Sequence, residues 1–302
     1  MRKEWVKYLC DPIDKTNLKV DRIIKKNGSN ILLGTLKSKS GNIYNIKEGV
    51  PILLNRRTQP VKTVDSFAYE WEQFDFDYGE KGWLEDVVRP SVGNLKYFKN
   101  KVVVDCGAGS GRQSLWMARA GAKFVFSIEL SDCAVTVVKK VAERYQDKIF
   151  VIQADLAYLP VNPLKAKVDL VYCVNVIQHT KNPQKTLSEL SLFLRPGSEF
   201  LFNIYLKRGN LYLINLVQLL KKIMKIFPNF LIKLVSLTIT IIVYPLKLTR
   251  HGFREFWLDI YDLLGSHSYQ KFYSEEEVAK MLAKSRLKIT KRSHYVMLLK
   301  RN

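Results

Sequence analysis

Residues 102–112 read VVVDCGAGSGR, and this stretch decides the fold class. Its three valines favour a buried strand, whereas Gly107, Gly109 and Gly111 suit a tight turn in which the backbone comes close to another group. The residues that follow, QSLWMARA, have a helical pattern. A strand, a glycine turn and a helix in succession predict a ligand-binding turn at the carboxyl edge of a sheet.

Strand-like and helix-like segments continue to alternate after this turn. The strand-like ones are KVVVDC, AKFVFSIEL, KIFVIQAD, VDLVYCVNV and SEFLFNIYL, and the helix-like ones span about 112–120, 132–145 and 182–194. Continuous apolar strands between helices are typical of a parallel sheet covered on both faces. We therefore expect an α/β fold with a doubly wound, mostly parallel sheet.

Three classes of ligand use a turn of this kind. A P-loop needs Gly-Lys-Ser/Thr, but Gly111 is followed by Arg112-Gln113, which excludes that class. A dinucleotide turn needs G-x-G-x-x-G, and counted from Gly107 the last place is Arg112, so a nicotinamide cofactor stays only as an alternative. The pattern present is D-x-G-x-G-x-G, which begins with Asp105.

Acidic residues end three successive expected strands. They are Asp105, Glu129 in FSIEL and Asp155 in IQADL. Asp105 would repel a pyrophosphate but suits an amino group, Glu129 can accept both hydroxyls of a ribose, and Asp155 can receive an adenine amino group. The three acids indicate a pocket for an adenosine compound with a cationic amino-acid tail, and S-adenosylmethionine fits this description.

The five segments VVVDCGAGSGR, FSIEL, IQADLAYLP, VDLVYCVNVIQHT and LRPGSEFLFNIY resemble class I S-adenosylmethionine-dependent methyltransferases in order and spacing. The resemblance implies a Rossmann-like sheet of seven strands. It places Asp105, Gly107 and Gly109 at the methionine part, Glu129 at the ribose, Asp155 with Leu156 at the adenine and Asn175 near the sulfonium. The neighbouring residues expected to border the cofactor are Ala108, Gly111, Leu130 and Ala154.

Residues 1–58 form a separate expected unit, a small β-rich module with a turn at Asn27-Gly28. YLCDPIDKTNL and SGNIYNIKEGVPILL resemble the small zinc-ribbon-like domain of methyltransferase activators. Of the cysteine places only Cys10 is kept; Ile13 or Asp14, Lys37 and Ser40 stand at the others. Because structural zinc usually takes four ligands, we expect no metal and a docking or packing role.

The charge of the chain is uneven. The net charge is +21, and it divides into +8 for residues 1–60, +1 for 61–204 and +12 for 205–302. This asymmetry suggests an anionic partner, either a membrane surface or nucleic acid, although a lysine-rich composition without any partner is the alternative. Nucleic acid is the weaker candidate, because the basic segments lack interleaved aromatic residues that could stack on bases.

Residues 206–265 are expected to form a basic, apolar helical insert. Its first helix carries a cationic stripe at Asn215, Gln218, Lys221, Lys222 and Lys225, and a second apolar run spans 230–244. At about 15 residues, this run is shorter than the roughly 20 that cross a bilayer, so residues 207–254 are predicted to lie on an anionic membrane surface. A lid over the site and a homodimer contact remain alternatives.

Residues 59–205 are expected to be the methyltransferase core, and 266–302 the last helix and strand pair of its sheet. Within the core, His179 is the candidate general base, with a structural role in its loop as the alternative. Aromatic residues crowd between 67 and 83, where Tyr69 or Trp71 can face the sulfonium through a cation–π contact or simply pack in the core.

Together these features predict a methyltransferase that uses S-adenosylmethionine on a small-molecule or lipid-linked acceptor. We expect it in the cytoplasm, attached peripherally to the inner membrane face. An RNA methyltransferase and a non-catalytic scaffold that only binds the cofactor are the alternative functions.

Overall fold

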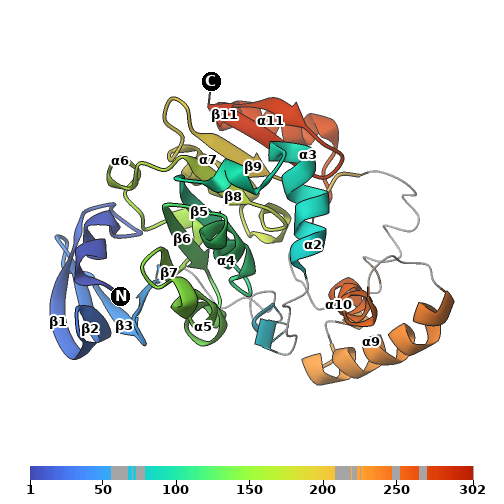
Figure 1. Ribbon diagram of the computed structural model, residues 1–302, viewed down its shortest axis with the longest axis horizontal. Coiled ribbons are helices and arrows are strands. Elements are labelled where there is room, and N and C mark those ends of the chain that lie inside the picture. The colour runs from blue at the N-terminus through green and yellow to red at the C-terminus, as the bar shows by residue number, and fades with distance from the viewer. Residues whose placement is uncertain are drawn as a thin grey trace.

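The valine run forms β5 (Val102–Cys106), which lies at the centre of the sheet. The computed structural model describes residues 1–55, 67–69, 71–72, 79–207, 219, 223–224, 226–246, 252–264 and 271–301 (Figure 1). Within these residues, eleven strands form one sheet in the order β1-β2-β3-β4-β7-β6-β5-β8-β9-β11-β10.

The parallel part of the sheet confirms the expected α/β architecture. It consists of β5, β6 (Phe124–Glu129), β7 (Ile149–Ala154), β8 (Leu170–Cys173) and β9 (Glu199–Phe202). Val103 and Val104 on β5 point to opposite faces, and neither is exposed. Such strands are buried on both sides, which explains why their sequences are continuously apolar rather than alternating.

Helices cover both faces of this sheet. One face packs against the helical segment α2 (Glu80–Gly82), η2 (Trp83–Val88) and α3 (Arg89–Val92), and against η3 (Leu95–Phe98), α4 (Arg112–Arg119), η4 (Ala134–Val138), α5 (Lys139–Ala142) and η5 (Glu143–Tyr145). The other carries η6 (Leu156–Tyr158), α6 (Pro163–Ala166), η7 (Ile177–His179), α7 (Pro183–Ser191) and α11 (Glu275–Lys284). The sheet is therefore doubly wound.

The C-terminal strands make the sheet mixed. β11 (Met297–Arg301) pairs antiparallel with both β9 and β10 (Leu287–Arg292). The capping box expected at Ser274 is present, because the Ser274 hydroxyl accepts from the Glu277 N–H (3.1 Å) and the Glu277 carboxylate accepts from the Ser274 N–H (2.8 Å). Two backbone N–H groups at the start of α11 that have no partner within the helix are thereby hydrogen-bonded.

The N-terminal residues extend the central sheet. After η1 (Lys3–Tyr8), the strands β1 (Leu18–Asn27), β2 (Asn30–Ser38), β3 (Ile43–Lys47) and β4 (Val50–Leu53) form an antiparallel meander. Its last strand then pairs parallel with β7, Ile52 opposite Gln153 and Leu53 opposite Ala154. The sheet therefore has eleven strands instead of the expected seven, because β1–β4 are added to β5–β11 through the pairing of β4 with the edge strand β7.

The N-terminal strands share their core with the central sheet. The ring of Trp5 lies 4.8 Å from that of Phe150 and 5.2 Å from that of Phe124, measured between centroids. The zinc-ribbon likeness and the four domain boundaries stay predictions. Within the N-terminal residues, the loops 10–17 and 38–42 are joined by a hydrogen bond from Asn42 Nδ2 to Asp11 Oδ2 (2.9 Å).

The described part of the insert consists mainly of two helices. α9 (Asn229–Val243) continues into η8 (Tyr244–Leu246), and α10 (Phe253–Leu264) packs against α9. Figure 1 shows this pair on the opposite side of the molecule from β1–β3. The predicted cationic stripe at Asn215, Gln218, Lys221, Lys222 and Lys225 lies outside the described residues.

Candidate functional site

The glycine turn has a backbone that only glycine adopts without strain. Gly107, Gly109 and Gly111 have φ angles of +69°, +57° and +79°. A Cβ atom would lie 2.6 Å from the Val176 side chain at Gly107, 2.9 Å from Trp71 at Gly109 and 3.1 Å from Val138 at Gly111. Conformation and close packing therefore both require the three glycines. Ala108, which lies between Gly107 and Gly109, is buried and donates its N–H to the Ile128 carbonyl (2.8 Å).

The Glu129 carboxylate lies beside this turn, at the end of β6. Its Oε2 accepts from the Gly109 N–H (2.8 Å), and its Oε1 accepts from the N–H (2.9 Å) and the hydroxyl (2.8 Å) of Ser131. Burial raises the pKa of Glu129, and these hydrogen bonds oppose the rise. The structure thus brings Gly109 and Glu129 together, as their places at neighbouring strand ends predict.

Asp105 lies under helix α4. It is 2% exposed, and its Oδ2 accepts a hydrogen bond from the Ser114 hydroxyl (2.5 Å), which lies 2.8 Å from the Ser127 hydroxyl. Burial raises the pKa of Asp105 to about 7, against the lowering effect of the Ser114 hydrogen bond. The partner that the structure provides is Ser114, and a contact of Asp105 with the methionine part stays a prediction.

The expected adenine residues follow β7. Ala154 and Leu156 are buried, while Asp155 is half-buried and accepts from the Ala157 N–H (2.8 Å) as the N-cap of η6. Leu130, also half-buried, accepts from Gln153 Nε2 through its carbonyl (3.2 Å). These residues end neighbouring strands β6 and β7, so they lie at the same edge of the sheet as the glycine turn.

Asn175 stands after the tip of β8 with a φ of +62°. Its Oδ1 accepts from Asn203 Nδ2 (2.8 Å) and from the Tyr295 hydroxyl (2.6 Å), and its backbone N–H donates to Asn203 Oδ1 (2.6 Å). The sequence analysis missed both partners. The sequence contained a signal for Asn203, because it directly follows β9 and parallel strands end at one edge of the sheet. It contained no signal for the contact of Tyr295.

Aromatic side chains cover the glycine turn. The rings of Phe67 and Trp71 are stacked (centroids 6.3 Å apart), Phe67 meets His179 edge to face (5.1 Å), and His179 meets Tyr205 in the same way (5.6 Å). His179 is thereby placed beside the site, which suits either role considered for it. Of the other aromatic residues between 67 and 83, Phe74, Phe76 and Tyr78 lie outside the described residues, and Trp83 packs in the core against Trp116 of α4 (centroids 5.2 Å apart).

The insert packs onto this cover. Tyr69 and Trp71 contact the apolar cluster of Ile232, Tyr261 and Leu264, which belongs to α9 and α10. The glycine turn, the aromatic segment and the insert therefore form successive layers, and the site is closed on this side by residues more than a hundred positions further along the chain.

The site residues fit S-adenosylmethionine. A buried acceptor, Glu129, adjoins a backbone that comes close to its neighbours, and a second carboxylate, Asp155, follows the next strand. A carboxylate offers about four acceptor positions, of which the protein uses three at Glu129, so a ribose hydroxyl can still be accepted. Among the described residues, no group of three or more His, Cys, Asp or Glu side chains is placed to hold a metal ion.

A comparison with known protein families identifies the same segment. Residues 104–202 match the family described as "Methyltransferase domain". A ubiquinone biosynthesis O-methyltransferase of Coxiella burnetii is 27% identical over 119 residues, 39% of this chain and 50% of that protein. Protein arginine N-methyltransferase 1 of Caenorhabditis elegans is 48% identical over 95 residues, 28% of this chain and 27% of that protein. The chain thus spans half or less of these relatives.

The comparison with solved structures also finds a methyltransferase. Magnesium protoporphyrin IX methyltransferase of Synechocystis PCC 6803, with bound SAH, is 19% identical and superposes with a TM-score of 0.41 over 78% of this chain and 91% of that one. The family match covers the segment that carries the glycine turn, Glu129, Asp155 and Asn175. Residues 104–202 of this chain therefore carry a methyltransferase domain, and the site residues within it suit S-adenosylmethionine as the cofactor.

Proposed function

We propose that this protein methylates a small-molecule or lipid-linked acceptor while it rests on the inner, cytoplasmic face of a membrane. The observation that carries the proposal is the outward face of α9, which is apolar although it lies at the surface. The proposal is supported by the burial pattern of α9, by the charge of the insert and by the contact of the insert with Trp71, which covers Gly109.

The inward face of α9 is the less apolar one. Ile232, Ser236 and Thr240, spaced four residues apart, are fully buried. Ser236 accepts a hydrogen bond from Trp257 Nε1 of α10 (3.0 Å), which ties the two helices together. A surface helix of a soluble protein normally has the opposite arrangement, with its apolar stripe toward the core.

Large apolar side chains of α9 and η8 point outward. Phe230 is 65% exposed, Leu234 58% and Ile242 67%, and Ile241 and Leu246 belong to the same exposed set. The stretch Asn229–Leu246 has a mean hydropathy of 1.8, and it is long and apolar enough to cross a membrane by length and composition alone. Its hydrogen-bonded packing on α10 favours a position along the membrane surface instead.

The charge of the insert matches an anionic membrane. Residues 207–254 contain nine Lys or Arg and no Asp or Glu. Each Lys or Arg near an anionic leaflet contributes about 1 kcal/mol to the free energy of membrane binding. Apolar side chains that enter the interface and cations that meet the headgroups would therefore act together, as in amphipathic helices that lie in the membrane plane.

The insert also links this surface to the site. The cluster of Ile232, Tyr261 and Leu264 contacts Trp71, and Trp71 covers Gly109. An acceptor that partitions into the membrane would thus meet the methyltransferase domain through one layer of aromatic side chains. This arrangement favours an acceptor with an apolar portion over an RNA.

The chemistry required of the protein is mainly positioning. When bound, S-adenosylmethionine supplies an electrophilic methyl group on a sulfonium. Glu129 would hold the ribose, Phe67 and Trp71 would exclude water, and His179 would accept the proton of an acceptor hydroxyl or amine. Since positioning of the reacting groups can contribute several kcal/mol, exclusion of water and a fixed orientation are the main tasks of these residues.

A labelling experiment tests the acceptor class. The protein is incubated with methyl-labelled S-adenosylmethionine and a cell extract, which is then separated into lipid, small-molecule and RNA fractions. Label in the lipid or small-molecule fraction is expected. Label in RNA alone would favour an RNA methyltransferase, and binding of S-adenosylhomocysteine without any labelled fraction would favour a non-catalytic scaffold.

A sedimentation experiment tests the membrane surface. The double variant Leu234→Ser/Ile242→Ser should lose binding to vesicles that contain anionic phospholipid, whereas Leu164→Ser/Leu192→Ser, which changes exposed leucines elsewhere, should keep it. Equal binding by both variants would contradict the proposed surface. The alternative is a homodimer contact through α9. It would be assigned if the unchanged protein forms dimers in solution and does not bind vesicles, and if the first double variant abolishes these dimers.

A further inference from the structure

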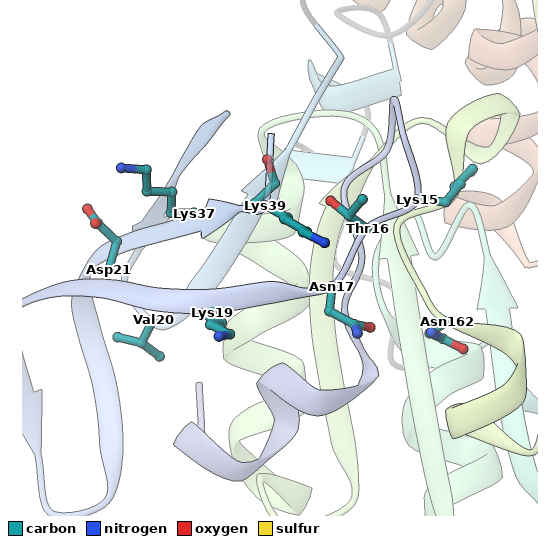
Figure 2. Close-up of a pocket in the computed structure, with 10 residues that line it drawn as sticks. Lys15, Thr16, Asn17, Lys19, Val20, Asp21, Lys37, Lys39 and Asn162 are labelled. Atoms are coloured by element: carbon teal, nitrogen blue, oxygen red, sulfur yellow. The ribbon is translucent and has the colours of Figure 1, made fainter. Parts of the chain in front are cut away.

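A pocket of about 760 Å³ lies between the N-terminal hairpin and the loop before α6. Figure 2 shows Lys19, Lys37 and Lys39 around it, with Asn17 and Asn162 on the side of the central sheet. None of these residues belongs to the methyltransferase site described above. The pocket is distinctive because four lysines and two asparagines line it against a single carboxylate.

Two of the lysines face each other across a strand pair. Lys19 on β1 lies directly opposite Lys37 on β2, and Lys39 follows two residues later. Like charges in directly opposite positions destabilise a strand pair. Among the described residues, no carboxylate lies within 4 Å of the ammonium group of Lys19, Lys37 or Lys39. The hairpin therefore concentrates positive charge that the protein does not neutralise there.

The two amide side chains add donors, because their oxygens are already bonded within the protein. Asn17 Oδ1 accepts from Lys165 Nζ (3.0 Å). Asn162 Oδ1 accepts from the N–H groups of Leu164 and Lys165 (3.1 and 3.3 Å) as the N-cap of α6. The Nδ2 groups of both residues, which have no acceptor among the described residues, remain for a ligand.

Two other charged residues of the pocket have protein partners. The Lys15 ammonium is bonded to Glu189 Oε2 (2.8 Å) and to the Leu159 carbonyl (3.2 Å). Asp21, the acidic residue of the lining, accepts from the Thr35 hydroxyl (2.8 Å). Three ammonium groups and two amide N–H₂ groups therefore face the pocket against one carboxylate.

We propose that this pocket binds a phosphorylated ligand with two adjacent phosphate groups, at a site separate from the methyl-transfer site. Phosphate oxygens accept from several ammonium donors at once, and such charge-assisted hydrogen bonds are stronger than those between neutral groups. Lys19 and Lys37 would share one phosphate from opposite strands, which removes their repulsion. Lys39 and the two amides would bind the second.

The test titrates inorganic pyrophosphate into the full-length protein by calorimetry. Saturable binding of one equivalent is expected, and the double variant Lys19→Gln/Lys37→Gln should weaken it by about tenfold or more. The control is Lys25→Gln/Lys26→Gln, which removes the same charge from β1 at positions outside the pocket and should change affinity by less than about threefold. Binding of S-adenosylhomocysteine shows whether each variant is folded.

The remaining arms identify the source of the phosphates. The vesicle arm uses the Leu234→Ser/Ile242→Ser variant, in which the proposed α9 contact with the membrane is removed. Binding of this variant to vesicles with diacylglycerol pyrophosphate, displaced by pyrophosphate and lost when Lys19→Gln/Lys37→Gln is added, would assign the phosphates to a lipid headgroup. Binding of free pyrophosphate alone would assign them to a soluble ligand. Absence of pyrophosphate binding, equal loss in both double variants, or RNA binding that pyrophosphate does not displace would each overturn the proposal.

Discussion

Replacing Asp105 by Asn should stabilise the protein above neutral pH. The carboxyl group is 2% exposed, and its burial raises its pKa from 3.8 to about 7. Asn has the same shape and can still accept the hydrogen bond of the Ser114 hydroxyl. The substitution therefore removes a buried charge while it keeps the packing under α4.

The direction with pH follows from proton binding. Between about pH 4 and pH 7 the folded state keeps the Asp105 proton and the unfolded state does not, so the free energy of unfolding falls as pH rises through this range. The stabilising effect of protonation is fully present below about pH 4 and is lost above about pH 7.

The magnitude follows from the same two values. A pKa of about 7 in place of 3.8, at roughly 1.36 kcal/mol per pH unit, corresponds to about 4 kcal/mol. The pKa of about 7 already includes the hydrogen bond from Ser114, but Asn buries an N–H₂ donor where a carboxylate oxygen stood, and an unsatisfied buried donor costs about 1 to 3 kcal/mol. We therefore expect Asp105→Asn to raise the free energy of unfolding by about 2 kcal/mol at pH 8 and to leave it nearly unchanged or lower at pH 4.

Urea denaturation followed by circular dichroism at pH 4, 6 and 8 measures this difference. Asp147→Asn serves as the control, because that carboxylate is 69% exposed and its replacement should change stability by no more than about 0.5 kcal/mol. Equal or lower stability of Asp105→Asn at pH 8, with an unchanged pH dependence, would refute the view that Asp105 is a buried carboxylate with a raised pKa.

Three further substitutions test the ribose contact and the packing around the site. Glu129→Gln should weaken binding of S-adenosylhomocysteine about tenfold or more in calorimetry, since a neutral amide accepts more weakly from a ribose hydroxyl and its N–H₂ group would face an N–H of Gly109 or Ser131; unchanged affinity would contradict the expected ribose contact. Gly109→Ala should destabilise the protein more than Gly28→Ala, because both have a positive φ but only the first meets Trp71, at 2.9 Å; equal losses in thermal unfolding would argue against that packing. Gln178→Leu should raise stability by about 1 to 3 kcal/mol, because neither polar atom of this buried amide has a partner among the described residues; a lower melting temperature would show that the amide is bonded.

The central sheet could be predicted because its signals are local. Each parallel strand is a continuous apolar run, since it is buried on both faces, and the three glycines mark a turn where side chains do not fit. The acids that follow these strands could also be expected at one edge, because the carboxyl ends of parallel strands lie at the same edge of a sheet. Their proposed contacts with the cofactor stay predictions.

The number of strands could not be predicted in this way. β4 joins the edge of β7 through two residue pairs, and nothing in the sequence near Ile52 or Gln153 distinguishes a free edge from an occupied one. Likewise, the partners of Asn175 come from Asn203 and Tyr295, which are distant in sequence. Pairing between distant segments depends on which surfaces remain after the core has formed.

By itself, the sequence of this protein determined the strand, the glycine turn and the helix, together with the succession of strands and helices along the parallel core, because apolar periodicity and φ preferences act over a few residues. Only the tertiary structure decided that Asp105 turns under α4 toward Ser114, that α9 presents its apolar side outward, and that Lys19 stands opposite Lys37. These features depend on which segments pack against each other, and packing follows from the surface that the whole chain buries.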